Sequence, residues 1–255
     1  MKIQEKFDLT GKVALVTGAS KGIGKAIALA MGQAGASIII SSRKQEILDK
    51  LAKDMRQEGI NVLPLVGHVG DEQSMKILVD KAVEKYDGID ILVNNAAINP
   101  TFGPVEDTDA ATFDKIMQVN VKGPFELAKM VHPIMISRGG GSIINIGSIG
   151  GLSPETLLGI YSVSKAALIS LTKVMAKEWG AENIRANVIC PGLVKTKFSE
   201  ALWSNEKILK SVMRQQPLTM LAEPDDIAGL ALLLASEAGS FCNGGVYTAD
   251  GGYTI

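Results

Sequence analysis

The chain has 255 residues, 46% of them hydrophobic, and a formal net charge of −1 from 26 basic and 27 acidic side chains. This balance excludes an electrostatic case for binding nucleic acid or an anionic membrane surface. No apolar run approaches the roughly 20 residues that span a bilayer, and the first nine residues lack the apolar core of a signal peptide. Cys190 and Cys242 are too far apart in the sequence to suggest a disulfide framework or a zinc site. We therefore expect a cytoplasmic protein with no metal site and no nucleic-acid or membrane partner.

Short apolar runs alternate with helical patterns along the chain. The strand candidates are Val13–Val16, Ser37–Ile40, Val62–Val66, Ile91–Val93, Ser142–Ile146, Ala186–Ile189 and Val246–Ala249. Helix candidates begin near Gly24, Gln45, Asp71, Ala110, Tyr161 and Pro224. Strands that alternate with helices predict right-handed crossovers and a parallel sheet covered on both faces. Since no Pro/Ser-rich linker interrupts the pattern, we expect one α/β domain, 1–255: a Rossmann-type, doubly wound, seven-stranded parallel sheet.

A glycine-rich loop, residues 17–24 (TGASKGIG), lies between the first strand candidate and the helix that follows. This order is the context that a dinucleotide-binding fingerprint requires. Gly18 permits a tight turn, Gly22 lets the backbone approach a pyrophosphate, and Gly24 lets the helix pack closely on the strand. The N–H groups and the positive dipole end of the helix then face the anion. The loop predicts a bound dinucleotide, although its spacing is GxxxGxG rather than GxGxxG.

The residues after the second strand candidate indicate which dinucleotide binds. This point meets the adenosine ribose, where an NAD-dependent enzyme usually has a carboxylate. Here residues 41–44 read SSRK, and no acid appears before Glu46. Arg43 can bind a 2′-phosphate through a bidentate fork, and Lys21 can reach the same group. We predict NADP(H) as the preferred cofactor and NAD(H) as a possible one. The alternative is that Lys21 and Arg43 are solvated surface charges.

Motifs follow five of the strand candidates. They are the glycine loop after the first, Ser42-Arg43 after the second, NNAA (94–97) after the fourth, Ser148 after the fifth and Pro191-Gly192 after the sixth. The carboxyl ends of parallel strands meet at one edge of a sheet, and open α/β sheets bind their ligands there. The five motifs therefore predict a single site. Asp71, followed by Ser74, is expected to be the N-cap of the next helix.

Tyr161 and Lys165 occupy positions i and i+4 of an expected helix over 161–181, so they share one face. A free phenol has a pKa of about 10, and a neighbouring ammonium is expected to lower it. Ser148, thirteen residues before Tyr161, can hold a carbonyl or alcohol oxygen. Together the three groups predict proton transfer at an oxygen as a hydride arrives at or leaves the carbon. Tyr-x-x-x-Lys alone is a weak signal, because exposed helices often carry such a pair.

Asn120 lies within the helical stretch 112–131 (TFDKIMQVNVKGPFELAKMV). Asparagine disfavours a helix slightly, and Gly123 and Pro124 follow at once. A kink at this point would free a backbone carbonyl for water. The alternative is a buried asparagine that is satisfied by the backbone.

In order and spacing, TGASKGIG, NNAA, Asn120, Ser148, Tyr161, Lys165 and Pro191-Gly192 resemble the short-chain dehydrogenase/reductase family. The resemblance extends from about Leu9 to the end of the chain. Segments such as ISSRKQ, GHVG and NNAAINPTFGP look particularly like the NADPH-dependent carbonyl reductases of the retinal-reducing branch. The resemblance implies an NADP(H)-dependent oxidoreductase that interconverts carbonyls and alcohols, and a homotetramer.

The resemblance also implies residue roles. Ser148 would bind the carbonyl oxygen, Tyr161 donate the proton, Lys165 lower the tyrosine pKa and bind the nicotinamide ribose, and Asn120 hold a relay water. Thr196 would hold the nicotinamide carboxamide. His68 replaces the acid that the family commonly places near the adenine, and contact through the Val69 backbone and the His68 ring is expected. The expected cofactor-binding residues are Gly18, Ser20, Lys21, Gly22, Ile23, Ser42, Arg43, Lys44, His68, Val69, Asn95, Ala96, Tyr161, Lys165, Pro191, Gly192, Val194 and Thr196.

Substrate choice is expected in the segment 195–217, which follows the sixth strand candidate and carries Phe198, Leu202 and Trp203 at near-helical spacing. Such a segment can form a lid over an apolar pocket. With Leu152 nearby and no charge cluster, we predict small apolar or aromatic carbonyl substrates. The expected substrate contacts are Ser148, Leu152, Tyr161, Phe198 and Trp203. The alternative is that the apolar lid residues only pack on the protein.

Three other functions remain open. A 3-oxoacyl-carrier-protein reductase uses the same catalytic residues, with basic residues such as Lys195 and Lys197 near the cleft. An NAD-dependent alcohol, sugar or hydroxysteroid dehydrogenase is a further enzyme reading. The non-enzymatic alternative is a sensor that binds NADPH without catalysis, although relatives of that kind tend to lose the residues that correspond to Tyr161 or Lys165.

Overall fold

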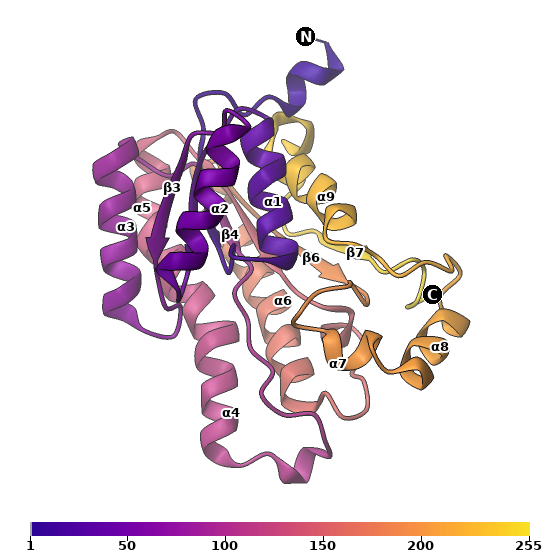
Figure 1. The fold of residues 1–255 in the computed structure, drawn as a ribbon. Helices are drawn as coiled ribbons and strands as arrows, with labels where there is room; N and C mark the ends of the chain where they lie inside the picture. The colour runs from indigo at the N-terminus through magenta and orange to yellow at the C-terminus, as the bar shows by residue number, and fades with distance from the viewer. Residues whose placement is uncertain (1) are drawn as a thin grey trace.

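The computed structural model describes residues 2–255, and a parallel sheet runs through its centre (Figure 1). The strands are β1 Val13–Thr17, β2 Ser37–Ser42, β3 Val62–Val66, β4 Ile91–Asn94, β5 Gly141–Ile146, β6 Ile184–Pro191 and β7 Val246–Ala249. Their order is β3-β2-β1-β4-β5-β6-β7, and every neighbouring pair is parallel. All seven strand predictions are confirmed. The continuous apolar runs are explained by burial on both faces of the sheet.

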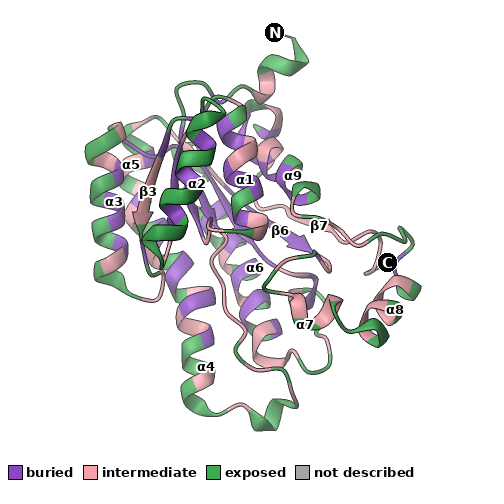
Figure 2. Cartoon of the chain, in the orientation of Figure 1, coloured by how far each residue is buried: buried purple, intermediate pink, exposed green. Residues whose placement is uncertain are grey.

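Helices cover the two faces of this sheet (Figure 1). They are α1 Gly22–Gln33, α2 Gln45–Gln57, α3 Glu72–Tyr86, α4 Ala110–Met117, α5 Gly123–Ser137, α6 Gly159–Trp179, α7 Glu200–Trp203, α8 Glu206–Gln215 and α9 Asp225–Ala235. Residues of α1, α2 and α9 form one core cluster with the sheet, and residues of α3, α5 and α6 form a second. Figure 2 shows the central strands buried between helices whose outer faces are exposed, whereas the edge strands β3 and β7 are mostly of intermediate burial. The predicted single doubly wound domain is confirmed.

Two helix predictions concern local signals in the sequence. The side chain of Asp71 accepts a hydrogen bond from the Ser74 N–H and caps α3, as predicted. The stretch around Asn120 is not one continuous helix. A π-helical turn, Gln118–Lys122, separates α4 from α5, so the predicted kink takes the form of one wider turn.

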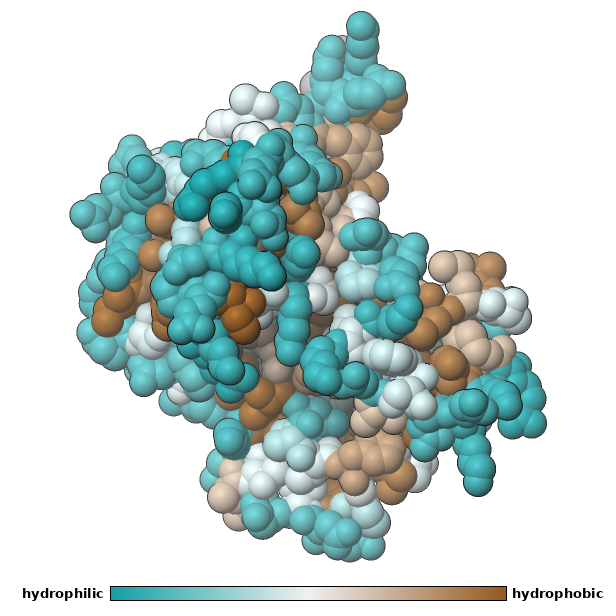
Figure 3. Space-filling model, viewed as in Figure 1, coloured by the Kyte–Doolittle hydropathy of each residue, from teal (hydrophilic) through white to brown (hydrophobic). Residues whose placement is uncertain are grey.

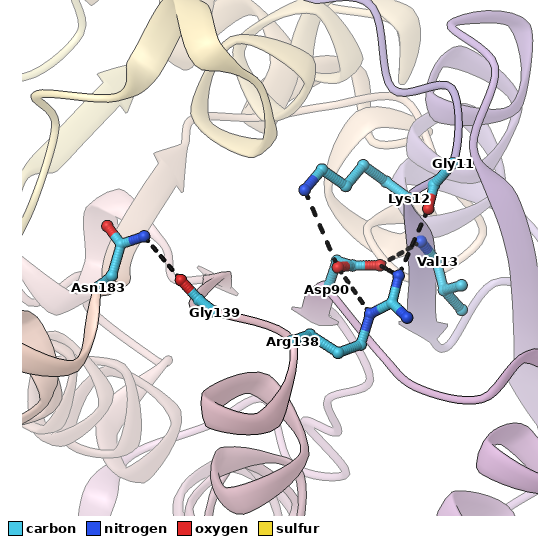
Figure 4. A network of polar contacts seen from close by, with 7 residues as sticks. All are labelled: Gly11, Lys12, Val13, Asp90, Arg138, Gly139 and Asn183. Carbon is cyan, nitrogen blue, oxygen red and sulfur yellow. Dashed lines mark hydrogen bonds and ion pairs between the residues drawn. The ribbon is translucent and has the colours of Figure 1, made fainter.

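An ion pair between the buried Asp90 and the partly buried Arg138 ties the amino ends of β1 and β4 together (Figure 4). Asp90 accepts hydrogen bonds from the Val13 N–H at 2.8 Å and from Nε and Nη2 of Arg138 at 2.9 and 3.0 Å. Lys12 Nζ lies 4.0 Å from the same carboxylate. Arg138 is the C-cap of α5, and its hydrogen bonds to Asp90 raise its pKa. The network holds the amino edge of the sheet to one of its covering helices.

Candidate active site

A cavity of about 460 Å³ lies at the carboxyl edge of the sheet, where the predicted motifs meet. A cavity of this size is typical of a small-molecule site. Residues from all five motifs line it: Gly18, Ser20, Lys21, Gly22, Ile23, Ser42, Arg43, Asn95, Ala96, Ser148, Pro191 and Gly192. His68, Val69, Tyr161, Lys165, Val194 and Thr196 line it as well. β1 and β4 are neighbours in the sheet although chain order reverses between them, and this is the switch point at which such folds bind ligands.

The glycine loop is held tightly against β4. Gly18 has a φ of +63°, and a Cβ at that position would lie 2.7 Å from Asn95 Nδ2. A Cβ on Gly24 would lie 2.7 Å from the Gly18 carbonyl oxygen. Asn95 Nδ2 donates to the carbonyl oxygens of Thr17 and Gly18 at 3.0 and 3.1 Å. Asn95 therefore orders the loop from the NNAA motif, in addition to lining the cavity.

The end of β2 carries the groups expected to face the adenosine. Ser42 Oγ is buried, and no described residue hydrogen-bonds to it. Arg43 and Lys21 line the same part of the cavity with exposed side chains. The His68 ring lines the cavity, and its Nδ1 accepts a hydrogen bond from the Gly70 N–H at 3.1 Å. Lys44, predicted to contact the cofactor, instead occupies the exposed N-cap position of α2, outside the cavity lining.

Ser148, Tyr161 and Lys165 come together at the end of β5. Ser148 begins the 3₁₀ turn Ile149–Gly151, and its Oγ accepts from the Gly150 N–H at 3.1 Å. Lys165 is only 3% exposed, and its Nζ donates to the Ile146 carbonyl oxygen at 2.7 Å. The same Nζ lies 5.6 Å from the centre of the Tyr161 ring. One strand end and one helix face thus place a hydroxyl, a phenol and an amine at one wall of the cavity.

Burial dominates the proton affinities of these groups. It raises the pKa of Tyr161 to about 12, although the Ser148 hydroxyl acts in the opposite direction. It also lowers the pKa of Lys165 to about 8. Desolvation is the largest cause and leaves the pKa of the phenol above its ordinary value of about 10, whereas the sequence predicted a lowered pKa beside Lys165. At neutral pH the pair is a neutral phenol beside an ammonium ion.

Asn120 lies behind the cavity wall rather than in it. The side chain is 1% exposed and lies in the π-helical turn. Its Oδ1 accepts from the Ile98 N–H at 2.9 Å, and its Nδ2 donates to the Ile98 carbonyl and to Ser164 Oγ at 2.9 and 3.0 Å. Ser164 Oγ in turn donates to the Tyr161 carbonyl at 2.7 Å. The asparagine therefore connects the loop after β4 with the helix that carries Tyr161 and Lys165.

The segment after β6 covers the other side of the cavity, and apolar residues gather on the surface around α7 and α8 (Figure 3). Phe198 and Leu202 line the cavity, and the Phe198 ring centre lies 6.0 Å from that of Tyr161. Trp203 and Leu152, both predicted substrate contacts, lie outside the lining. Trp203 Nε1 instead donates to the Thr196 carbonyl at 2.8 Å, and Leu152 is 44% exposed. The indole therefore holds α7 to the start of the same segment, at Thr196.

The structure adds lining residues that the sequence did not single out. They include Phe102 after β4, Glu155 and Leu158 before α6, Ile208 and Val212 on α8, and Tyr253 near the end of the chain. The amphipathic pattern of α8 was the available signal for Ile208 and Val212. Glu155 and Tyr253 lie in irregular segments, and no motif marked them.

Comparison with known proteins decides the family. A family model described as "Enoyl-(Acyl carrier protein) reductase" matches residues 18–254. The protein "Dehydrogenase/reductase SDR family member 4" of Oryctolagus cuniculus is 42% identical over 250 residues, which cover 98% of this chain and 96% of the relative. Its namesake in Homo sapiens is 43% identical over 244 residues, which cover 96% and 88%. The chain belongs to the short-chain dehydrogenase/reductase family. The predicted family is confirmed, and the protein is an oxidoreductase of this family.

Solved structures of other short-chain dehydrogenases/reductases have the same fold. A gluconate 5-dehydrogenase from Burkholderia cenocepacia, in complex with NADP and tartrate, superposes with a TM-score of 0.95 at 33% identity and 99% coverage of both chains. A 7α-hydroxysteroid dehydrogenase, complexed with NADH and 7-oxo glycochenodeoxycholic acid, also has a TM-score of 0.95, at 34% identity with 99% and 98% coverage. The family uses nicotinamide cofactors of both kinds.

The residues of this member of the family fit such a cofactor. Gly18 and Gly22 both have positive φ values, which favour glycine. The loop therefore has no side chain at these two positions, where a pyrophosphate would approach. The buried Ser42 Oγ has a free hydrogen-bonding capacity at the adenosine end, and buried polar groups normally have a partner. A nicotinamide dinucleotide in the cavity would supply that partner.

Proposed function

We propose that the protein is an NADP(H)-dependent carbonyl reductase that reduces ketones and aldehydes to alcohols. The observation that carries the proposal is the meeting of Ser148, Tyr161 and Lys165 in the same cavity as the glycine loop. Arg43 and Lys21 at the end of β2 support NADP(H) over NAD(H), because both can pair with a 2′-phosphate. NAD(H) remains usable at lower efficiency.

Each group has a distinct role in the proposed reaction. The bound cofactor supplies the hydride. Ser148 Oγ donates a hydrogen bond to the substrate carbonyl oxygen and fixes it beside Tyr161. The Tyr161 phenol donates its proton to that oxygen as negative charge develops on it. The ammonium of Lys165 stabilises the phenolate that forms, and Asn120 positions the tyrosine helix and a relay water at the π-helical turn.

The proton affinities favour reduction over oxidation near neutrality. With a pKa raised to about 12, Tyr161 is protonated and ready to donate. The reverse reaction needs the phenolate, which is rare at neutral pH, so alcohol oxidation is expected to be faster at higher pH.

The lining supports small apolar or aromatic carbonyl substrates. Phe102, Leu158, Phe198, Leu202 and Ile208 line the cavity, and the Phe198 ring centre lies 6.0 Å from that of Tyr161. An acyl-carrier-protein substrate, suggested by the description of the family model, would need exposed positive charge around the mouth. Lys195 instead pairs with Glu223 at 3.2 Å, and Lys197 pairs with Glu200. Sugar and hydroxysteroid dehydrogenation rank lower still, because their support comes only from neighbours. The presence of all four of Asn120, Ser148, Tyr161 and Lys165 argues against a sensor that does not catalyse.

We also propose that the protein is a cytoplasmic homotetramer. α4, α5 and α6 expose Phe113, Phe125, Val163 and Val174, and Ile255 is fully exposed at the end of the chain, which supports two contact surfaces. No helix within residues 2–255 is long and apolar enough to cross a membrane. Light scattering tests the assembly: a mass of one chain would refute the tetramer. Cell fractionation tests the location, and recovery of the protein with organelles would refute the cytoplasm.

The experiment is NADPH oxidation with a panel of aromatic ketones, diketones, retinal and acetoacetyl thioesters, and with NADH in parallel. Tyr161→Phe is expected to lower kcat by about 10²–10⁴-fold, the usual value of general acid catalysis, while NADPH binding is retained. Tyr86→Phe removes a remote hydroxyl that donates only to Asn61 and is the matched control. Normal turnover in Tyr161→Phe would overturn the assignment of Tyr161 as the proton donor. A preference for acetoacetyl thioesters would favour a 3-oxoacyl-carrier-protein reductase.

A further inference from the structure

Glu155 is the one acidic side chain among the described residues that line the cavity. It lies in the irregular segment between the 3₁₀ turn that begins at Ser148 and α6. The basic residues of the lining (Lys21, Arg43, Lys115, Lys165 and Lys197) suit an anionic dinucleotide. A carboxylate contributes nothing to that binding, so Glu155 calls for a separate explanation.

The Glu155 carboxylate has no partner within residues 2–255. No described residue forms a hydrogen bond or an ion pair with its side chain, whereas Lys165 donates to Ile146 and Lys197 pairs with Glu200. Glu155 is partly buried, and desolvation raises its pKa above the ordinary value. A partly buried carboxylate without a hydrogen-bond partner is unfavourable. A ligand that donates a hydrogen bond to it would therefore bind with a more favourable free energy.

The surroundings place this carboxylate at the substrate end of the cavity. Glu155 lies six residues before Tyr161, which is near the start of α6, and Glu155, Tyr161 and Tyr253 all line the same cavity. The charge of Glu155 also raises the pKa of both phenols. Leu158 and Phe198 line the cavity beside these groups, and the Phe198 ring contacts that of Tyr161. A molecule whose carbonyl oxygen lies at Tyr161 therefore extends along apolar walls towards a single negative charge.

We propose that Glu155 is a specificity-determining residue that accepts a hydrogen bond from a protonated amine on the carbonyl substrate. The preferred substrates are then amino ketones and amino aldehydes with an apolar or aromatic body. Carboxylate-bearing carbonyls are disfavoured, since they bring a like charge to Glu155. This inference rests on the proposed carbonyl reduction and names its substrate class.

The test uses three ketones of one shape and different charge: para-ethylacetophenone, para-(aminomethyl)acetophenone and para-acetylbenzoate. Values of kcat/KM are measured with NADPH near neutral pH for the wild type, Glu155→Gln and Glu84→Gln. Glu84 is an exposed acid on α3, so its variant makes the same change in net charge away from the cavity. In the wild type, the amine is expected to exceed the neutral ketone by about 10- to 100-fold, the value of one charge-assisted hydrogen bond. The carboxylate is expected to fall below the neutral ketone.

In Glu155→Gln, the kcat/KM values of the amine and of the carboxylate, each divided by that of the neutral ketone, are expected to approach one. Glu84→Gln is expected to keep the wild-type ratios. Ratios that are the same in wild type and Glu155→Gln would overturn the inference, even if all three ketones turn over. Absence of turnover on every ketone would count against the proposed function instead. In that case, dissociation constants of the same compounds for the NADPH complex, measured by calorimetry, decide the role of Glu155 by the same ratios.

Discussion

Replacing Arg43 by alanine is expected to separate the two nicotinamide cofactors. Arg43 lines the cavity at the end of β2, next to Ser42, whose Oγ has no hydrogen-bond partner among the described residues. The one acid in the described lining, Glu155, belongs to the segment before α6. A guanidinium–phosphate contact adds charge-assisted hydrogen bonds that NADH, without a 2′-phosphate, cannot make. The variant therefore removes an interaction specific to NADPH.

The exposure of Arg43 sets the expected size of the effect. A hydrogen bond to a charged group contributes about 1.5–3 kcal/mol. Because the side chain is exposed and screened by salt, we take the lower part of that range, about 1.5–2 kcal/mol. This corresponds to about 10- to 30-fold in kcat/KM for NADPH, with almost no change for NADH.

Steady-state rates with both cofactors, at low and high ionic strength, measure this effect. Lys44→Ala is the matched control, because it removes the same charge one residue further along, outside the cavity lining. The wild-type preference for NADPH should also shrink as salt is added. Equal Michaelis constants for NADPH and NADH in the wild type, unchanged in Arg43→Ala, would refute the reasoning.

Two further predictions follow from the buried charges. Arg138→Met should lower the free energy of unfolding by about 2–3 kcal/mol, measured by urea denaturation. Asp90 loses two charge-assisted hydrogen bonds but keeps the one from the Val13 N–H and the nearby Lys12. An unchanged urea midpoint would contradict this. The rate of ketone reduction should fall as pH rises through about 8, because burial lowers the pKa of Lys165 to that value and the ammonium is lost above it. A rate that is constant from pH 7 to about 9 would show that the charge on Lys165 is not needed.

The sheet and its site edge were predictable because they depend on local patterns. Runs such as Val13–Val16 can only be buried strands in this context, and a glycine loop between strand and helix has one common use. The order of such strands then brings distant motifs to one edge. The parallel order of the strands therefore made the position of the site predictable from the positions of the motifs in the sequence.

Other properties depended on tertiary contacts that a linear pattern does not carry. The pKa of Tyr161 is raised because the packed protein removes water from the phenol. Trp203 faces the Thr196 carbonyl rather than the cavity. In a segment with helices as short as α7, periodicity cannot show which of these two directions a side chain takes. Glu155 and Tyr253 are nearly one hundred residues apart, and the fold of two irregular segments brings both to the lining of one cavity.

The Asp90–Arg138 network (Figure 4) lies at the amino edge of the sheet. The glycine loop, Ser148 and the lid lie at the carboxyl edge. The two edges are separated by the length of the strands, so mutations at one edge leave the packing of the other largely untouched. Loops such as 195–217 are then free to vary in sequence without loss of the network that holds β1, β4 and α5 together. For an engineer, this means that stabilising changes at the amino edge and changes of substrate range at the carboxyl edge are expected to combine additively.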